Sequence, residues 1–104
     1  MVAERAMDDG APEALTETDI AAICRQYIVD EFLLGVGTIE DDGSLLESGA
    51  IDSTGIVELA TWLEVRFGIH VDDDDMTTSN LDSVERIARF VARRRAAAGR
   101  RRPE

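Results

Sequence analysis

The chain has 104 residues, enough for one small domain with a single core, and its formal net charge is −11. That acidity excludes nucleic acid and anionic membranes as primary partners, and it favours encounter with basic protein surfaces. The chain has neither an apolar run of the ~20 residues of a membrane span nor a secretory signal, and its single cysteine excludes an internal disulfide, so we expect a cytoplasmic monomer.

The first predicted helix follows a polar segment, residues 1–15, that lacks periodicity and is expected to be a disordered tail. Thr16 is the predicted N-cap, with Asp19 at the capping-box position, and Gly35 is the predicted stop. Between them, apolar residues recur at helical spacing, and the stripe continues toward Phe32 and Leu34. Its central members are Ile20, Ile23, Cys24, Tyr27 and Ile28.

A long connection separates this helix from the next. Residues 35–52 contain glycines and acidic side chains without any period, and a loop of this length in a compact domain is often functional. A second helix is predicted from Ser53 to Phe67, closed by Gly68. Three apolar residues are expected to hold the loop against the core: Leu45, Leu46 and Ile51.

The C-terminal part predicts a short helical turn at residues 72–75 and a third main helix. Asp82 is the predicted N-cap of that helix, with Glu85 at the capping-box position. Its apolar face consists of Val84, Ile87, Ala88 and Val91. Residues 94–104 are basic and alanine-rich, and we expect a flexible tail there.

Together these elements predict an all-α fold over residues 16–93. The fold is a bundle of three main helices and one short helix, with the long loop between the first and second helices. No segment carries a strand or hairpin signal.

The second helix has two faces when its residues are placed at 100° intervals. The face predicted to be buried carries Ile56, Leu59, Ala60, Leu63 and Phe67. The face predicted to be exposed carries Thr54, Val57, Glu58, Thr61, Glu64 and Val65.

Ser53 lies where the loop ends and this helix begins. Because Ser and Asp are common N-caps, the residue types alone favour a simple cap by Asp52 or Ser53. A hydrolase nucleophile is disfavoured, because the glycine of a nucleophile elbow is missing. The only histidine, His70, lies about 22 Å away at the other end of the helix, too far to act as a base. A third interpretation is an attachment point, since the helix N-terminus would favour a phosphate esterified to Ser53.

The segments GAIDSTGIVELATWLEVRFGI and NLDSVERIARFV resemble the acyl carrier protein family, including its stand-alone aminoacyl and peptidyl carrier relatives. The resemblance covers residues 16–93 and rests on Asp-Ser at the start of the second helix. The motif residues that follow are Val57-Glu58-Leu59, Leu63-Glu64 and Phe67-Gly68-Ile69. It implies a four-helix acyl-carrier-like bundle.

The resemblance also implies that Ser53, with Asp52 beside it, forms the cofactor-binding site for 4′-phosphopantetheine. A separate phosphopantetheinyl transferase would transfer this group from coenzyme A, and its thiol would hold acyl groups as thioesters. The chain would then be a non-catalytic carrier. Its partners would be an acyl- or aminoacyl-loading ligase or transferase and biosynthetic enzymes with basic docking patches. The implied docking positions are Thr54, Val57, Glu58, Thr61 and Glu64.

Thr54 and Thr61 depart from the family pattern, which usually has Leu or Met at the first position and often Met at the second. Both changes disfavour standard fatty-acid synthase partners. The expected function is an acyl carrier for fatty-acid-like, polyketide or other secondary-metabolite biosynthesis. The alternatives are an aminoacyl or peptidyl carrier, and a helical interaction module without a prosthetic group.

The remaining candidates have simpler explanations. Cys24 lies on an apolar stripe and is expected to be buried and inert. Residues 72–75 lack the spacing of a calcium loop, and His70 alone cannot form a metal site, so no metal is predicted. Trp62 is expected to pack at the edge of the core. Gly55 costs helix propensity of up to ~1 kcal/mol, and it either loosens the surroundings of the serine or saves space.

Overall fold

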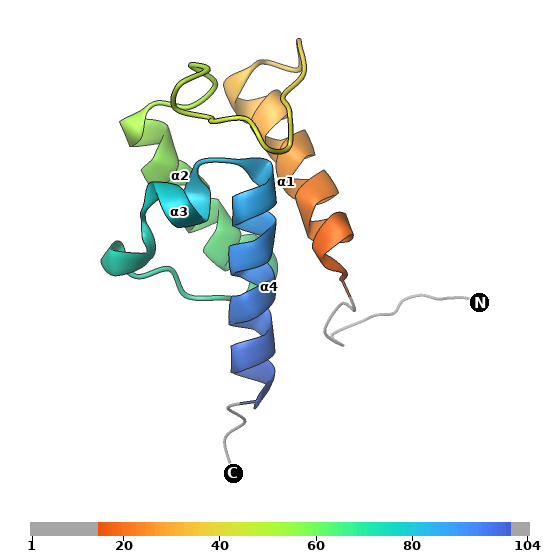
Figure 1. The fold of residues 1–104 in the computed structure, drawn as a ribbon, viewed down its shortest axis with the longest axis vertical. Coiled ribbons are helices and arrows are strands. Elements are labelled where there is room, and N and C mark those ends of the chain that lie inside the picture. Colours follow the sequence, from red (N-terminus) through yellow and green to blue (C-terminus); the bar gives the residue numbers. More distant parts are fainter. Residues whose placement is uncertain (1–14, 101–104) are drawn as a thin grey trace, which may run out of the picture.

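The structure is a computed structural model that describes residues 15–100, and it contains helices but no strand over that range (Figure 1). The helices are α1 (Glu17–Phe32), α2 (Ser53–Phe67), α3 (Thr78–Leu81) and α4 (Val84–Arg100), with a 3₁₀ turn, η2 (Asp73–Asp75). This confirms the predicted all-α bundle of three main helices and one short helix. The expected tail over residues 1–15 falls outside the described residues except for Leu15, as do residues 101–104.

The start of α1 is the predicted capping box. Thr16 Oγ1 accepts a hydrogen bond from the Asp19 N–H at 3.0 Å, and Asp19 Oδ2 accepts one from the Thr16 N–H at 3.0 Å. The helix ends earlier than predicted, because Leu34 already adopts a positive φ of 55°. The chain therefore turns away before Gly35, and Leu34 is 84% exposed, so its expected place on the buried stripe was wrong.

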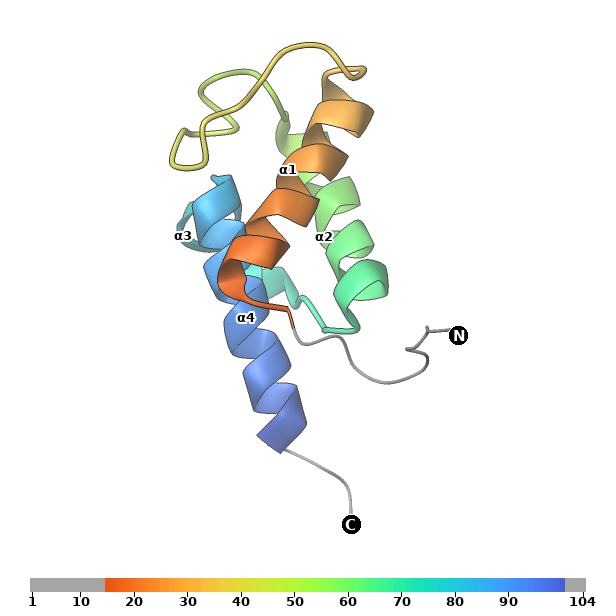
Figure 2. The same ribbon diagram turned by 90° about the vertical axis from the view of Figure 1, so that its right-hand side faces the viewer.

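One hydrophobic core joins the three main helices. Figure 2 shows α1 and α2 running alongside each other below the long loop. Tyr27 of α1 stacks on Trp62 of α2, with ring centroids 3.9 Å apart, and Trp62 meets the Phe67 ring edge-on at 5.8 Å. Trp62 thus packs at the edge of the core, as predicted. The largest fully buried side chains are Phe90, Ile20, Ile28, Leu45, Ile51, Leu59, Leu63, Leu81 and Ile87.

The long loop is held against the core by two of the three expected residues, Leu45 and Ile51, which are 1% and 2% exposed. The prediction for Leu46 was wrong, since it is 37% exposed and lines an open pocket described below. The loop is also fixed by Asp41, whose carboxylate accepts two hydrogen bonds of 2.8 Å from the Arg25 guanidinium.

Asp82 fixes the other half of the loop instead of capping α4. Its carboxylate accepts hydrogen bonds from Ser44 Oγ at 2.6 Å and from the Leu46 N–H at 3.0 Å. The cap of α4 is Ser83, whose Oγ accepts a hydrogen bond from the Arg86 N–H at 3.1 Å. The predicted cap was therefore one residue early, because both neighbours are good capping residues and the aspartate is engaged elsewhere.

The α4 helix continues to Arg100, past the expected domain end at residue 93. Alanine and arginine are both strong helix formers, which accounts for the extension. Arg94 anchors this part by donating from Nη2 to both carboxylate oxygens of Asp75, each at 2.7 Å. The expected boundary at residue 93 thus lies inside a helix.

None of the described helices is long and apolar enough to cross a membrane.

Candidate functional site

Ser53 is the first residue of α2, and Asp52, not Ser53, caps the helix. Asp52 Oδ1 accepts a hydrogen bond from the Gly55 N–H at 2.8 Å, and the Asp52 backbone is extended. Ser53 is exposed, and its hydroxyl makes no hydrogen bond within residues 15–100. The two capping candidates left open by the sequence are thus separated, and the Ser53 hydroxyl is available to solvent.

The backbone around Ser53 presents hydrogen-bond donors to solvent. Asp52 occupies the Gly55 N–H, while the N–H groups of Ser53 and Thr54 have no acceptor among the described residues. Unpaired N–H groups and the helix dipole favour an anion at this end of a helix. The Asp52 carboxylate bears a charge of the same sign as a phosphate, so the directed donors, not the net local charge, favour a phosphate here.

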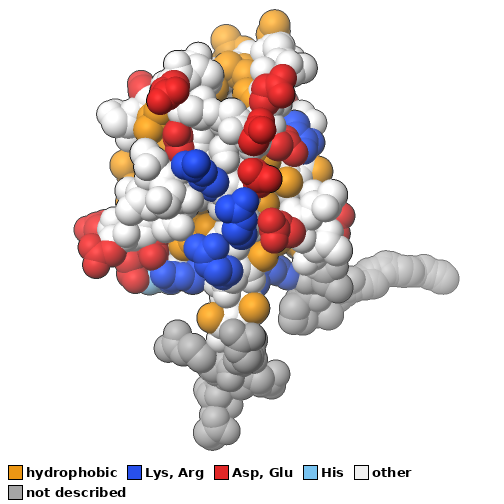
Figure 3. Space-filling model, viewed as in Figure 1, with side chains coloured by type: hydrophobic (Ala, Val, Ile, Leu, Met, Phe, Trp, Pro, Cys, Tyr) orange, Lys and Arg blue, Asp and Glu red, His pale blue; other side chains and the backbone are white. Residues whose placement is uncertain are grey.

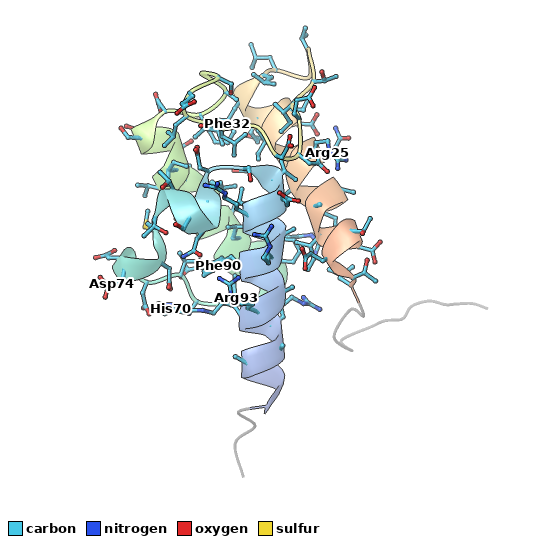
Figure 4. All side chains as sticks on the ribbon, viewed as in Figure 1. Arg25, Phe32, His70, Asp74, Phe90 and Arg93 are labelled. Atoms are coloured by element: carbon cyan, nitrogen blue, oxygen red, sulfur yellow. The ribbon has the colours of Figure 1, made fainter. Side chains whose placement is uncertain are left out.

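Gly55 saves space in the first turn of α2. A Cβ atom at this position would lie 2.8 Å from Ile51 Cγ2 and 2.9 Å from Phe32 Cε1, closer than real Cβ contacts allow. Phe32, labelled in Figure 4, comes from the end of α1, and Ile51 comes from the end of the loop. The missing side chain therefore lets both elements pack directly under the turn that carries Ser53.

An open pocket of about 270 Å³ lies beside Ser53, between α2 and the α3 region. Half of its lining residues are apolar, namely Leu46, Ile56, Met76 and Leu81. The others carry hydroxyl or carboxyl groups, namely Ser53, Thr77, Thr78 and Asp82. A short chain attached near Ser53 would meet both apolar contacts and hydrogen-bonding groups in this pocket.

The outer face of α2 is exposed, as its periodicity predicts. Thr54, Val57, Glu58 and Thr61 are all exposed, and Val57 retains 54% of its surface. Val65 lies on the same face and is 80% exposed, as the helical periodicity predicts. It was not among the predicted docking positions.

Glu64 differs from the other predicted docking residues because its carboxylate is engaged within the chain. Its Oε2 atom accepts a hydrogen bond from the Val71 N–H at 2.8 Å and lies 3.2 Å from His70 Nδ1. His70 Nε2 lies 2.6 Å from Asp72 Oδ1. Glu64 thus secures the chain that leaves α2, at the end opposite Ser53.

The other serines of the folded part are placed differently from Ser53. Ser44 Oγ donates to Asp82 at 2.6 Å, and Ser48 Oγ donates to the Leu45 carbonyl at 3.2 Å. Ser83 is 3% exposed and caps α4. Ser79 is exposed like Ser53, but it lies within the four-residue α3 and not at the N-terminus of a long helix.

The described residues hold no arrangement for nucleophilic or metal chemistry. Cys24 is fully buried, as predicted, and burial raises the pKa of its thiol to about 12, so it stays protonated and inert. The four aspartates 72–75 form the predicted turn, and no group of three His, Cys, Asp or Glu side chains in the described part is arranged to bind a metal ion.

Comparison with known proteins agrees with this geometry. The model of the family described as "phosphopantetheine attachment site" matches residues 25–91, a span that includes Ser53 and all of α2. No curated protein matches the chain. Members of the matched family bind a 4′-phosphopantetheine prosthetic group. Since the match covers more than half of the chain, this protein belongs to the phosphopantetheine attachment site family and is a phosphopantetheine-carrying carrier protein.

Proposed function

We propose that Ser53 carries the 4′-phosphopantetheine group and that the chain is an acyl carrier for a fatty-acid-like, polyketide or other secondary-metabolite pathway. The observation that carries this assignment is the cap made by Asp52. Because Asp52 satisfies the Gly55 N–H, the exposed Ser53 hydroxyl is left for an ester bond at a helix end that favours phosphate. Thus the residues present fit the group.

Each part of the site has a role in this proposal. Ser53 Oγ would supply the ester oxygen, and the N–H groups of Ser53 and Thr54 would hold the phosphate. Ile51 and Phe32 pack closely against Gly55 and so support the first turn of α2, which carries the attachment point. When bound, the group supplies a terminal thiol that holds acyl groups as thioesters. The chain is a non-catalytic cytoplasmic carrier, and partner enzymes perform the chemistry.

Partner enzymes dock on the outer face of α2 in this proposal. The partners are a phosphopantetheinyl transferase, a loading ligase or transferase, and biosynthetic enzymes with basic patches. Glu58→Arg should slow association with the transferase, and the effect should shrink at high salt as charges are screened. Unchanged kinetics at all salt concentrations would mean that docking does not depend on this charge.

Glu64 needs a different comparison, because it also binds the Val71 N–H. Glu64→Gln keeps a hydrogen-bond acceptor while removing the charge, whereas Glu64→Arg removes both. If Glu64 contributes to docking by charge, both variants should slow association. If only Glu64→Arg is slow, and its unfolding free energy is also reduced, the role of Glu64 is structural.

The proposal is tested by the intact mass of the protein after incubation with coenzyme A and a broad-specificity phosphopantetheinyl transferase. The expected result is the addition of one phosphopantetheine per chain. A protein that stays unmodified with several competent transferases would be the interaction module without a prosthetic group.

An aminoacyl or peptidyl carrier is the second candidate function. It is favoured by the hydroxyl-bearing Thr54 and Thr61 on the exposed face and by the hydroxyl groups of Thr77 and Thr78 in the pocket. Supplying the loaded protein with acyl-loading and aminoacyl-loading ligases, and weighing the products, separates the two. A product with only aminoacyl groups would replace the first assignment.

A further inference from the structure

The exposed side of α4 carries a row of arginines that is unusual in so acidic a chain. Arg86, Arg89 and Arg93 recur at helical spacing and are all exposed, opposite the side of α4 that packs in the core. We name these three residues the arginine ridge. Figure 3 shows basic side chains gathered along α4, and Figure 4 labels Arg93 among them.

Two members of the arginine ridge are held in place by neutral groups of α3. Arg86 Nη1 donates to the Thr78 carbonyl at 3.1 Å, and Arg93 Nη2 donates to Asn80 Oδ1 at 3.3 Å. Neither guanidinium contacts a carboxylate within residues 15–100. Both are therefore pre-oriented across α3 while their charge remains uncompensated.

The other arginines with a described partner behave differently. Arg25 makes a bidentate pair with Asp41 at 2.8 Å, and Arg94 donates from Nη2 to both carboxylate oxygens of Asp75 at 2.7 Å. Arg89, the middle member of the ridge, reaches Glu85 only at 3.7 Å, and both side chains are about half exposed, so this pair is weak. Arg25 and Arg94 thus neutralise carboxylates of the same chain, whereas within the described residues Arg86 and Arg93 do not.

The arginine ridge is narrow because acidic side chains lie on both sides of it. Figure 3 shows acidic groups to the left and right of the basic row. Figure 4 shows Asp74 of η2 to the left of Arg93, and its neighbour Asp73 is exposed as well. Glu85 lies 3.7 Å from Arg89, and its N–H donates a hydrogen bond of 2.8 Å to the Asp41 carbonyl. The surface therefore alternates from negative to positive to negative.

This alternation decides which kind of anion fits. A nucleic acid duplex or an anionic bilayer presents negative charge over a wide area and would meet the flanking carboxylates as well, within a Debye length of about 8–10 Å. A protein surface can present a single row of carboxylates that matches the ridge alone. Guanidinium groups already oriented by α3 suit carboxylates, which they bind through two parallel hydrogen bonds.

We propose that the arginine ridge is a second docking surface, for a partner protein that presents a row of carboxylates. It is separate from the acidic outer face of α2 and does not depend on the prosthetic group. A carrier with two surfaces of opposite charge can hold one partner on α3 and α4 while α2 stays open to another.

The test uses the full chain with Ser53→Ala, so that loading plays no part, and a ten-residue glutamate peptide as the probe. Titration at low salt, followed by backbone amide chemical shifts, should perturb residues of α3 and α4. Arg86→Gln and Arg93→Gln together should weaken binding about tenfold or more, and each alone should weaken it severalfold, whereas the single control on α2, Arg66→Gln, should change it by no more than about twofold. A loss at Arg66 equal to the loss at either ridge arginine, or no binding of the peptide, would overturn the proposal.

Two further titrations test whether nucleic acid or an anionic membrane binds the arginine ridge instead of a protein. A mixed-sequence DNA duplex and vesicles containing phosphatidylglycerol should each bind more weakly than the peptide, and ridge-dependent binding tighter than the peptide's would overturn the proposal. Sedimentation should show a monomer, because a dimer that the Arg86→Gln and Arg93→Gln changes abolish would assign the arginine ridge to a second copy of the chain. None of these outcomes bears on whether Ser53 is loaded.

Discussion

Asp52 and Gly55 form the hydrogen bond that starts α2, with 2.8 Å between Asp52 Oδ1 and the Gly55 nitrogen. Asp52 and its neighbour Ser53 could each have capped the helix, but only Asp52 does so. Asp52 closes the helix, and Ser53 keeps an exposed hydroxyl. Gly55 contributes twice, since its N–H is the capped donor and its missing side chain makes room for Phe32 and Ile51.

The division of tasks predicts different stability losses at the two positions. Asp52→Ala should reduce the free energy of unfolding by roughly 0.5–2 kcal/mol, the usual effect of losing a cap, and Asp52→Asn should restore most of it. Ser53→Ala should change it by no more than about 0.5 kcal/mol, because its hydroxyl holds nothing. Urea denaturation of the three variants measures these values. A larger loss at Ser53 than at Asp52 would show that the cap is misassigned.

Gly55→Ala should destabilise the protein although alanine is the better helix former. The helix propensity gain is about 1 kcal/mol, but the new Cβ would lie within 2.9 Å of side-chain atoms of Phe32 and Ile51. Overpacking typically costs about 1–3 kcal/mol, so we expect a net loss. Combining Gly55→Ala with Phe32→Leu tests the cause, since relief of the clash should make the two changes less harmful together than their sum. A more stable Gly55→Ala protein would contradict this packing.

The helical periodicity predicted most of this fold, including the bounds of α2, its buried face and the capping box of α1. It failed where two neighbouring residues suit the same role. Asp82 and Ser83 are both good caps, and only the folded loop shows that Asp82 is engaged by Ser44. The same ambiguity at Asp52 and Ser53 left the cap of α2 open, and the hydrogen bond from the Gly55 N–H assigns the cap to Asp52.

Tertiary contacts were the part that the sequence pattern could not provide. The need for glycine at position 55 comes from Ile51 and from Phe32, and Phe32 lies far away in the chain. Leu34 and Leu46 look like core residues in the sequence, yet a backbone turn and an open pocket leave them exposed. The orientation of Arg86 by α3 likewise depends on a backbone carbonyl, which carries no signal in the sequence.

The Arg25–Asp41 pair predicts a dependence of stability on pH. Hydrogen bonds from Arg25 lower the pKa of Asp41 below its ordinary value of 3.8. A lowered carboxyl pKa stabilises the fold above the unfolded-state pKa, and the contribution is lost as the pH falls through the folded-state pKa. Asp41→Asn should therefore cost up to about 1 kcal/mol at pH 7, because both side chains are partly exposed.

This cost should begin to shrink as the pH falls below the ordinary Asp41 pKa of 3.8, where the unfolded chain takes up the proton. It should vanish below the lower folded-state pKa, where Asp41 of the folded protein is neutral too. Thermal unfolding of both proteins between pH 7 and pH 2 measures the difference. A gap that stays constant across this range would mean that the charge of Asp41 contributes nothing to stability. Exposed Asp42→Asn is the matched control, which should show a much smaller change at any pH.

The burial of Cys24 predicts how many thiols of the protein react before and after loading. Burial and a pKa raised to about 12 should keep its thiol unreactive toward a disulfide reagent in the folded protein near pH 8. The protein before loading should therefore show no fast-reacting thiol when folded and one when unfolded. After phosphopantetheine transfer, one fast thiol should appear in the folded state. Rapid reaction of the folded, unloaded protein would contradict the burial of Cys24.

The most direct test of the central claim is peptide mapping by mass spectrometry after phosphopantetheine transfer from coenzyme A, comparing the unmodified sequence with Ser53→Ala and Ser79→Ala. The account predicts modification at Ser53 alone, no modification of Ser53→Ala, and full modification of Ser79→Ala, which removes another exposed serine. Circular dichroism should show that Ser53→Ala stays folded. Modification of a folded Ser53→Ala protein, or a modified peptide that lacks residue 53, would contradict the assignment of Ser53.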